Sequence, residues 1–299
     1  MKINQKLFLQ FGICIIFFSL IGILINNLTI NLIRTGLGFN FSWLFKPASF
    51  ALAEHPLPYT SSDSYAWALF IGWLNSLKVI VSSLILATFL GTLIGFARTV
   101  QNSLLGLISA GYITIIRQTP LLLQLMFWYF VGFLGLKDNI FVGINNIFKV
   151  SNQGIEVSGL TLSSEFSALV FGLSIFTSAY IAEVIRGGIL SVPRGQWEAF
   201  RSLGLSERKG LFNIIIPQAL PAIIPGLTSQ YLNLAKNSTL AIAVGYSDIY
   251  AINDTIINQT GKAIECFLIL LTSFLLLNLL ISNSMEIMNR IIIKPRKLN

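Results

Sequence analysis

The sequence predicts an all-α protein that crosses a membrane about six times. Of its 299 residues, 54% are apolar and only 11% are charged, and its mean hydropathy is +0.75. Soluble proteins carry about 25% charged residues, so a soluble fold of this size would lack the polar side chains to cover its surface. A bilayer removes this requirement because lipid solvates apolar side chains directly.

Six apolar stretches are each long enough to cross a bilayer, which takes about 20 helical residues. Lys2 and Lys6 precede the first stretch, as in a signal peptide, but no small-x-small cleavage pattern follows it. We therefore expect an uncleaved anchor helix there. The predicted spans are residues 7–30, 67–97, 116–136, 166–186, 213–240 and 264–289.

The positive charges indicate how these spans are oriented. The formal net charge is +8, but the Lys and Arg residues lie at the ends of apolar stretches rather than on one polar surface, so we expect no nucleic-acid partner. With the N-terminus in the cytoplasm, most of the 20 basic residues fall on the cytoplasmic side. This excess predicts that both termini are cytoplasmic.

Two long segments are predicted on the outer side. Residues 31–66 are rich in Gly, Phe and Trp, so we expect part of this segment to lie flat on the membrane interface. Residues 137–165 alternate weakly between polar and apolar and contain several Gly, which favours a short helix or a hairpin. We divide the chain into an N-terminal anchor with an outer segment, 1–66, and a membrane domain, 67–299.

The cytoplasmic segment at residues 187–212 predicts two short helices. Pro193 suits a first helical turn, and Gly204 suits the position just after a helix end. Ser206 is a good cap for the second helix.

The first of these short helices is amphipathic. Trp197, Phe200 and Leu203 are spaced three apart and share one face, while charged residues surround them. Such a helix could insert its aromatic face into a groove of a partner protein. It could equally be a loop helix that lies on the membrane surface.

The spacing of residues in this segment resembles the EAA loop of bacterial ABC importer permeases. That pattern is Glu-Ala-Ala, three residues, Gly, nine residues, Ile, one residue, Leu-Pro. Two identities depart from it, because Phe200 stands in place of the second Ala and Ile216 in place of Leu. The residues that match are Glu198, Ala199, Gly204, Ile214 and Pro217.

Other stretches resemble the polar amino-acid branch of this permease family, and the Gly- and Phe-rich segment before them is similar to general L-amino-acid permeases. Together they cover residues 70–290. The stretch Ile116–Tyr129 matches R-x-T-P-L-L-x-Q, and Ser178–Gly188 matches A-Y-x-A-E-x-x-R-G-G. Asn75–Lys78 and Tyr231–Leu240 resemble the start of the first core helix and a K-x-[ST]-[ST]-L stretch.

The resemblance implies the fold of a type I importer permease in a bacterial inner membrane, with an EAA coupling helix docked on a separate cytoplasmic ATPase. The chain itself has no G-x-x-x-x-G-K-[ST] phosphate loop. The implied partners are ATPase subunits, a second permease subunit, identical or homologous, and a periplasmic amino-acid-binding protein. The residues expected to couple to the ATPase are Trp197, Glu198, Ala199, Phe200, Gly204 and Pro217.

Charged residues inside the predicted spans are costly, so they are candidates for the substrate pathway. Lys78 or Lys236 could meet an amino-acid carboxylate and Glu183 its ammonium group. Each also has a structural explanation: Lys78 can extend to the outer surface, Glu183 can pair with Arg186 or Arg117, and Lys236 can pair with Asp248. Hydrogen-bonding neighbours make Lys236 the better candidate, namely Asn237, Ser238 and Thr239.

Proline residues mark the start of the fifth span. Pro217, Pro221 and Pro225 are four apart, so they lie near one face and weaken successive backbone hydrogen bonds. The result is either a flexible entry used in gating or a static kink held by neighbouring helices.

The sequence offers no pattern for covalent chemistry. It has one histidine, His55, and two cysteines, Cys14 and Cys266, which we expect to be buried free thiols. We therefore predict no catalytic residue, metal or cofactor. The alternatives to an ABC permease are an ion-gradient-driven secondary transporter or channel, which calls for inverted repeats, and a membrane scaffold without transport activity.

Overall fold

The computed structural model describes residues 2–34, 40–99, 104–136, 141–142 and 148–293. Within them, helices account for most of the chain, and five apolar helical stretches are long enough to cross a membrane. These stretches are Phe8–Arg34, Tyr65–Thr99, Ser164–Leu190, Glu207–Val244 and Ala263–Ile292.

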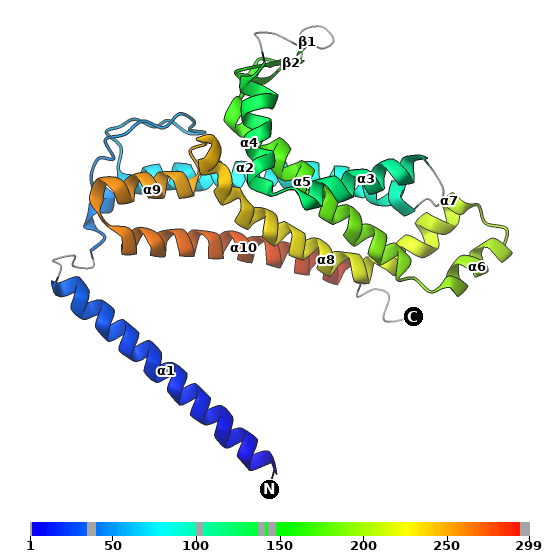
Figure 1. Cartoon of the computed structure of the whole chain (residues 1–299), viewed down its shortest axis with the longest axis horizontal. Helices are drawn as coiled ribbons and strands as arrows, with labels where there is room; N and C mark the ends of the chain where they lie inside the picture. Colours follow the sequence, from blue (N-terminus) through cyan, green and yellow to red (C-terminus); the bar gives the residue numbers. More distant parts are fainter. Residues whose placement is uncertain (1, 35–39, 100–103, 137–140, 143–147, 294–299) are drawn as a thin grey trace.

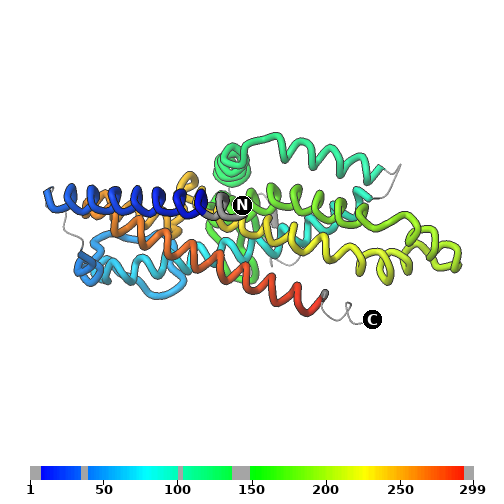
Figure 2. The backbone as a smooth tube through the Cα atoms, turned by 90° about the horizontal axis from the view of Figure 1, so that it is seen from below, coloured from blue at the N-terminus to red at the C-terminus, as the bar shows by residue number. Residues whose placement is uncertain are grey.

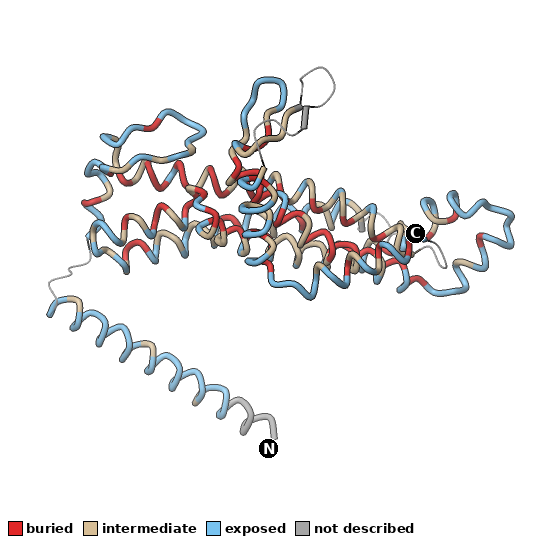
Figure 3. The backbone as a smooth tube through the Cα atoms, turned by 45° about the horizontal axis from the view of Figure 1, so that its top comes forward, coloured by how far each residue is buried: buried red, intermediate tan, exposed pale blue. Residues whose placement is uncertain are grey.

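Helix α5 (Ser164–Leu190) lies at the centre of the bundle. It packs along α2 (Tyr65–Thr99) and also contacts α8 (Ile216–Asn237), which in turn packs against α10 (Ala263–Ile293). Buried residues are concentrated along α2 and α5, as Figure 3 shows in red. The core of the protein is therefore this helix pair with α8 and α10 around it.

Glycines allow α2 and α5 to approach closely. A Cβ atom on Gly91 of α2 would lie 2.6 Å from the Cβ atom of Ile181, and one on Gly95 would lie 3.0 Å from the backbone oxygen of Ala182. Lipid tails are as apolar as the helices, so close van der Waals contact through small residues is a main source of helix association in a membrane.

Helix α1 (Lys2–Arg34) lies apart from this bundle (Figure 1). Its apolar stretch from Phe8 onward has no buried residue, and almost all of it is exposed in Figure 3. This agrees with a lipid-facing anchor helix. The segment after it contains Gly36 and Gly38, which lie outside the described residues.

The predicted span at residues 116–136 is not one continuous helix. Helix α3 (Leu104–Gln118) ends before Pro120, and a new helix begins as α4 (Leu121–Phe127) and continues as the π-helical segment η2 (Trp128–Leu134). Helix α4 runs across the long axis of the molecule, so it is seen end-on in Figure 2. Proline disfavours helical conformation in the residue before it, which explains a break at Thr119.

The segment before α2 is folded onto the bundle. A short 3₁₀ helix, η1 (Ser42–Phe45), places Trp43 edge-on against Tyr65 at 5.6 Å between ring centroids. The backbone N–H of Ala48 donates to the carbonyl of Asp63 at 2.7 Å. Residues 42–64 therefore form a compact cap on the first turns of α2. That part of residues 31–66 lies flat on the membrane interface stays a prediction.

The second outer segment contains a hairpin, as predicted, within a larger sheet. Strands β1 (Phe141–Val142), β2 (Phe148–Ser151), β3 (Gly154–Val157) and β4 (Leu160–Ser163) form an antiparallel sheet in chain order. Ser158 and Gly159 connect β3 to β4 with φ values of 51° and 85°, as a two-residue type I′ turn requires. Ser163 then caps α5, because its Oγ accepts a hydrogen bond from the backbone N–H of Phe166.

The close approach of α2 and α5 leads to a test. Gly91→Ala would place a methyl group against Ile181 and the backbone oxygen of Ser178, so we expect destabilisation of about 1–3 kcal/mol. The measurement is the thermal unfolding of purified protein in detergent.

Gly111→Ala on α3 is the matched control, because nothing lies within 4 Å of a Cβ atom there. It should be neutral or slightly stabilising, since Ala favours helices over Gly. Equal unfolding temperatures for the two variants would contradict the packing of α2 against α5.

Candidate functional site

A helix pair projects from the end of the bundle between α5 and α8. It consists of α6 (Arg194–Ser202) and α7 (Glu207–Gly210), and it forms the right-hand tip of Figure 1. We call the end of the molecule that carries it the α6 end. Most of the pair is exposed in Figure 3, so its surface is accessible to another protein.

The ends of both short helices follow the local predictions. The backbone at Gly204 has a φ of +71°, the left-handed conformation that ends a helix and that glycine adopts most readily. The Ser206 Oγ accepts a hydrogen bond from the backbone N–H of Lys209 and caps α7. The Nε of Arg201 donates to the Oε1 of Glu207 at 2.7 Å, an exposed ion pair that joins the two helices but contributes little free energy.

The predicted aromatic face of α6 does not point to a partner. Phe200 is only 1% exposed and packs within its own chain, where a Cβ atom on Gly210 would lie 2.3 Å from its ring. Trp197 is half-buried against the same core cluster, whereas Leu203 is 75% exposed. The three side chains are spaced three residues apart, but they differ in burial: Phe200 is buried, Trp197 is half-buried and Leu203 is exposed.

The accessible surface of the pair is thus formed by other residues. Glu198, Ala199 and Gly204 are exposed, in agreement with their predicted position at a docking surface. Leu203 and Leu205 add exposed apolar side chains beside them. Leu205 was not among the predicted residues; its position one residue after the helix-ending glycine is the signal that could have identified it.

A π-helical segment connects this helix pair to α8. Segment η4 (Leu211–Ile215) precedes Pro217, which lies in the first turn of α8. Proline has no N–H to donate to the carbonyl four residues before it, and single π turns occur where regular helical bonding is interrupted. Helix α8 remains α-helical through Pro221 and Pro225. The irregular π-helical segment therefore lies before α8 and not within it.

The segment around Lys236 lies at the other end of α8. The helix passes into a 3₁₀ segment, η5 (Ser238–Val244), directly after Asn237. Lys236 is exposed and has no ion pair among the described residues. The hydroxyls of Ser238 and Thr239 donate to carbonyls of their own helix, at 2.8 and 2.9 Å.

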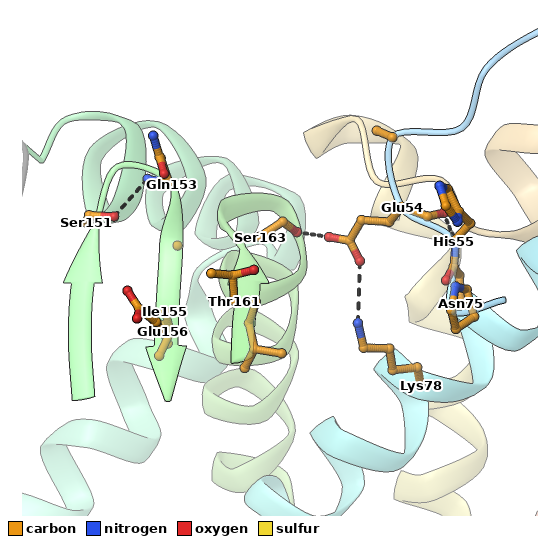
Figure 4. A pocket seen from close by; sticks show the side chains of 14 residues that line it. Glu54, His55, Asn75, Lys78, Ser151, Gln153, Ile155, Glu156, Thr161 and Ser163 are labelled. Carbon is orange, nitrogen blue, oxygen red and sulfur yellow. Dashed lines mark hydrogen bonds and ion pairs between the residues drawn. The ribbon is translucent and has the colours of Figure 1, made fainter. Parts of the chain in front are cut away.

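Lys78 lies in a polar pocket between α2, the cap segment and the sheet (Figure 4). Its Nζ is 3.5 Å from the Oε2 of Glu54 and 4.2 Å from the centre of the Phe166 ring. Glu54 also accepts a hydrogen bond from the hydroxyl of Ser163. The cavity has a volume of about 510 Å³ and includes side chains from β3 and β4.

Burial raises the pKa of Glu54 above its ordinary value, and the positive charge of Lys78 opposes this shift. The pair therefore holds a carboxylate and an ammonium group side by side. These are also the two charges of an amino acid, so the pocket contains complementary groups that are already paired with each other.

Glu183 is likewise paired. The Nη2 of Arg186 lies 2.8 Å from its Oε2, and the Nε lies 3.2 Å from both carboxylate oxygens. The predicted ion pair between Glu183 and Arg186 is therefore present. The predicted pairing of Lys236 with Asp248 is not among the described ion pairs; instead, Asp248 caps α9 (Ile249–Thr260) through a 2.8 Å bond from the N–H of Ala251.

Among the described residues, no cluster of three His, Cys, Asp or Glu side chains could hold a metal ion. Both cysteines are free thiols, and Cys266 is buried on α10 as predicted. The prediction of burial is wrong for Cys14, which is exposed on α1, a helix that lies apart from the bundle (Figure 1).

The buried cap of α9 generates a test of stability against pH. Asp248 lies outside the candidate spans, and burial raises its pKa to about 7. Because the folded state holds this proton more tightly than the unfolded state, the contribution to stability is complete below the ordinary pKa of aspartate and is lost as the pH rises through about 7. The unfolding temperature of the purified protein should therefore fall between about pH 5 and about pH 8.

Asp248→Asn should remove much of this decline, because the amide keeps the cap and does not ionise. Asp254→Asn, at an exposed position on the same helix, is the control and should keep the wild-type dependence. An unchanged decline in Asp248→Asn would contradict the assignment.

Comparison with known proteins adds to this geometry. Residues 87–294, more than half of the chain, match the family model described as binding-protein-dependent transport system inner membrane component. The chain is 33% identical to the putative amino-acid ABC transporter permease protein YhdX of Escherichia coli, over 91% of this chain and 90% of that protein. It is 31% identical to the general L-amino acid transport system permease protein AapQ of Rhizobium johnstonii, over 95% and 91% of the two chains.

The alignments with these two relatives extend over 353 and 366 residues, more than the 299 of this chain. The relatives therefore carry internal residues that this chain lacks.

Solved structures share the fold. A crystal structure of an amino acid ABC transporter with histidines matches with a TM-score of 0.60 and 28% identity, over 76% of this chain and 94% of that one. An inward-facing structure of the MetNI methionine ABC transporter matches with a TM-score of 0.58 and 18% identity, over 76% and 96% of the two chains. The architecture is that of an importer permease.

Proposed function

Because the chain belongs to the family of binding-protein-dependent transport system inner membrane components, we propose that it is the permease subunit of an ABC importer for amino acids. It forms half of a pathway through the membrane and has no ATPase site of its own. The substrate class rests on relatives that are amino-acid permeases by name and align along more than nine tenths of this chain. The working unit is the membrane domain of residues 67–299, and α1 is an added anchor.

The observation that carries this proposal is the exposed helix pair α6–α7. It lies at one tip of the molecule, and it carries the EAA spacing on an accessible surface. We propose that Glu198, Ala199, Leu203 and Gly204 contact a separate cytoplasmic ATPase. Phe200 and Trp197 act from the other face, by fixing α6 to the bundle.

The remaining partners follow from this role. A second permease subunit, identical or homologous, supplies the other half of the pathway, and two ATPase subunits dock at the α6 ends. A periplasmic amino-acid-binding protein delivers substrate to the opposite side, near the cap of residues 42–64 and the sheet. The chain lies in the bacterial inner membrane with both termini in the cytoplasm, in line with the excess of basic residues there.

Lys236 is the residue that we propose for the substrate carboxylate. It is exposed, and no described acidic side chain neutralises it. Asn237 and Thr239, which are partly accessible, follow it at the passage into η5, whereas Ser238 is buried there. Lys78 and Glu183 can serve the pathway only by exchanging Glu54 and Arg186 for substrate, so they are second to Lys236.

The direct test is ATP-dependent uptake of a panel of labelled amino acids by vesicles that contain the reconstituted complex. Uptake of at least one amino acid above the ATP-free level is expected. Uptake that follows an imposed ion gradient and ignores ATP would refute the proposal and support a secondary transporter.

The coupling surface has its own prediction. Gly204→Val forces a β-branched residue into the left-handed region, which costs about 1–2 kcal/mol and changes the angle between α6 and α7. We expect normal membrane insertion but at least about tenfold less ATPase subunit co-purified with the permease, since 1.4 kcal/mol corresponds to a factor of ten.

Gly111→Val on α3 serves as the control, because it introduces the same side chain at an open helical position. It should retain the ATPase. Wild-type amounts of ATPase with Gly204→Val would count against docking at this surface.

The pathway assignment is tested with Lys236→Gln. A hydrogen bond to a charged group contributes about 1.5–3 kcal/mol, so the KM for uptake should rise at least about tenfold while ATPase co-purification stays normal. Arg34→Gln, at the exposed end of the anchor helix α1 and outside the membrane domain, should leave uptake kinetics unchanged. If both variants transport like the wild type, Lys236 does not meet the substrate.

A further inference from the structure

A second cavity, of about 490 Å³, lies between the end of α2, helix α3 and the last turns of α5. Three arginine side chains line it, one from each of these helices: Arg98, Arg117 and Arg186. Glu183 is the acidic residue among the lining side chains. The cavity is at the same end of α5 as the helix pair α6–α7, and therefore on the side that we propose faces the cytoplasm.

The charges in this cavity do not balance. Glu183 is engaged by Arg186 through both nitrogens of its guanidinium edge, which neutralises that arginine. Arg98 and Arg117 form no ion pair within the parts of the chain that the structure describes. Arg117 stacks over the ring of Tyr180 at 5.0 Å, which orients its guanidinium without neutralising it.

Arg98 and Arg117 lie in the last turns of α2 and α3, where Arg98 is partly accessible and Arg117 is exposed, so an anion can reach both guanidinium groups. Guanidinium groups are planar donors that match phosphate oxygens in pairs, and they lose less free energy on desolvation than an ammonium group does. Thr114 and Gln118 line the same cavity and offer further donors. The donor set thus fits a phosphate group better than a single small halide ion.

Helix α3 shows how such an anion would arrive. Its outward face is apolar and exposed, with Leu104, Leu107 and Ile108 between 59% and 73% accessible. Acyl chains can lie on this face while the headgroup reaches the arginines at its side. Basic pockets between membrane helices on the cytoplasmic side are a known type of site for anionic lipid headgroups.

We propose that this cavity binds the phosphate group of an anionic phospholipid through Arg98 and Arg117. By binding Arg98 of α2 and Arg117 of α3, the phosphate links these two helices near the helix break at Pro120. Arg117 also contacts Tyr180 of α5. Free phosphate shares the same chemistry, and the experiment distinguishes the two sources.

The experiment uses the full chain purified in detergent. Thermal unfolding and native mass spectrometry are recorded with phosphatidylglycerol, with phosphatidylcholine of the same acyl chains, and with inorganic phosphate alone. Phosphatidylglycerol should raise the unfolding temperature and remain bound, whereas phosphatidylcholine should do neither. The Arg98→Gln, Arg117→Gln double variant should bind phosphatidylglycerol at least about tenfold more weakly.

Arg290→Gln is the control, because Arg290 is also a basic residue near the end of a membrane helix but is paired with Glu286 on exposed α10. It should bind phosphatidylglycerol like the wild type. If the double variant does not fold, Arg117→Lys replaces it: a point charge retains the attraction but loses the paired hydrogen bonds, so intermediate affinity is expected.

Three outcomes would overturn the lipid assignment. They are equal stabilisation by both lipids, unchanged phosphatidylglycerol binding in the double variant or in Arg117→Lys, and displacement of the lipid by a transported amino acid, which would make the cavity part of the pathway. Stabilisation by inorganic phosphate alone, lost in the double variant, would keep the phosphate site and assign it to free phosphate.

Discussion

The burial of Phe200 fixes helix α6 to the membrane bundle, and the proposed coupling to an ATPase depends on this contact. Helix α6 is joined to the bundle by short loops at both ends, so without an internal contact it would move independently of the membrane helices. Phe200 fills the space left by the missing side chain of Gly210 and joins a core cluster with Ile215. Full burial of a Phe side chain stabilises by about 1.5–3 kcal/mol. A hydrogen bond between Gln218 and Gln196 adds a second link from α8 to α6.

Features that depend on local chemistry could be predicted from the sequence. The end of α6 at Gly204 and the cap of α7 at Ser206 follow from backbone conformation and short-range hydrogen bonds. The long apolar helices follow from composition. The inward turn of Phe200 could not be predicted, because it depends on Gly210 and Ile215 from outside the helix. The interruption at Thr119 falls in the polar stretch Arg117–Thr119 directly before Pro120, inside the span predicted at residues 116–136.

The charged residues of the candidate site also divide into those whose partners are close in sequence and those whose partners are distant. Hydropathy identified Lys78 and Glu183 as unusual, but it could not reveal their partners. Glu54 lies in an irregular segment that folds back onto α2, so no helical spacing relates it to Lys78. Arg186 is only three residues from Glu183, and this pair was within reach of sequence reasoning. Tertiary folding thus pairs Lys78, a local contact pairs Glu183, and Lys236 is left as the unpaired candidate among the described residues.

Helices α5 and α8 connect the α6 end with the rest of the molecule in different ways. Helix α5 is continuous for 27 residues, about 40 Å at 1.5 Å per residue, from its cap at Ser163 to the loop before α6. Helix α8 is flanked by the π segment η4 and the 3₁₀ segment η5. A rigid displacement of α6 would therefore be carried unchanged along α5, whereas bending would concentrate at the two irregular ends of α8. Since η5 begins at Ser238, two residues after Lys236, a movement that begins at the α6 end would change the position of Lys236 relative to α5, which is the relation that the proposed transport cycle has to alter.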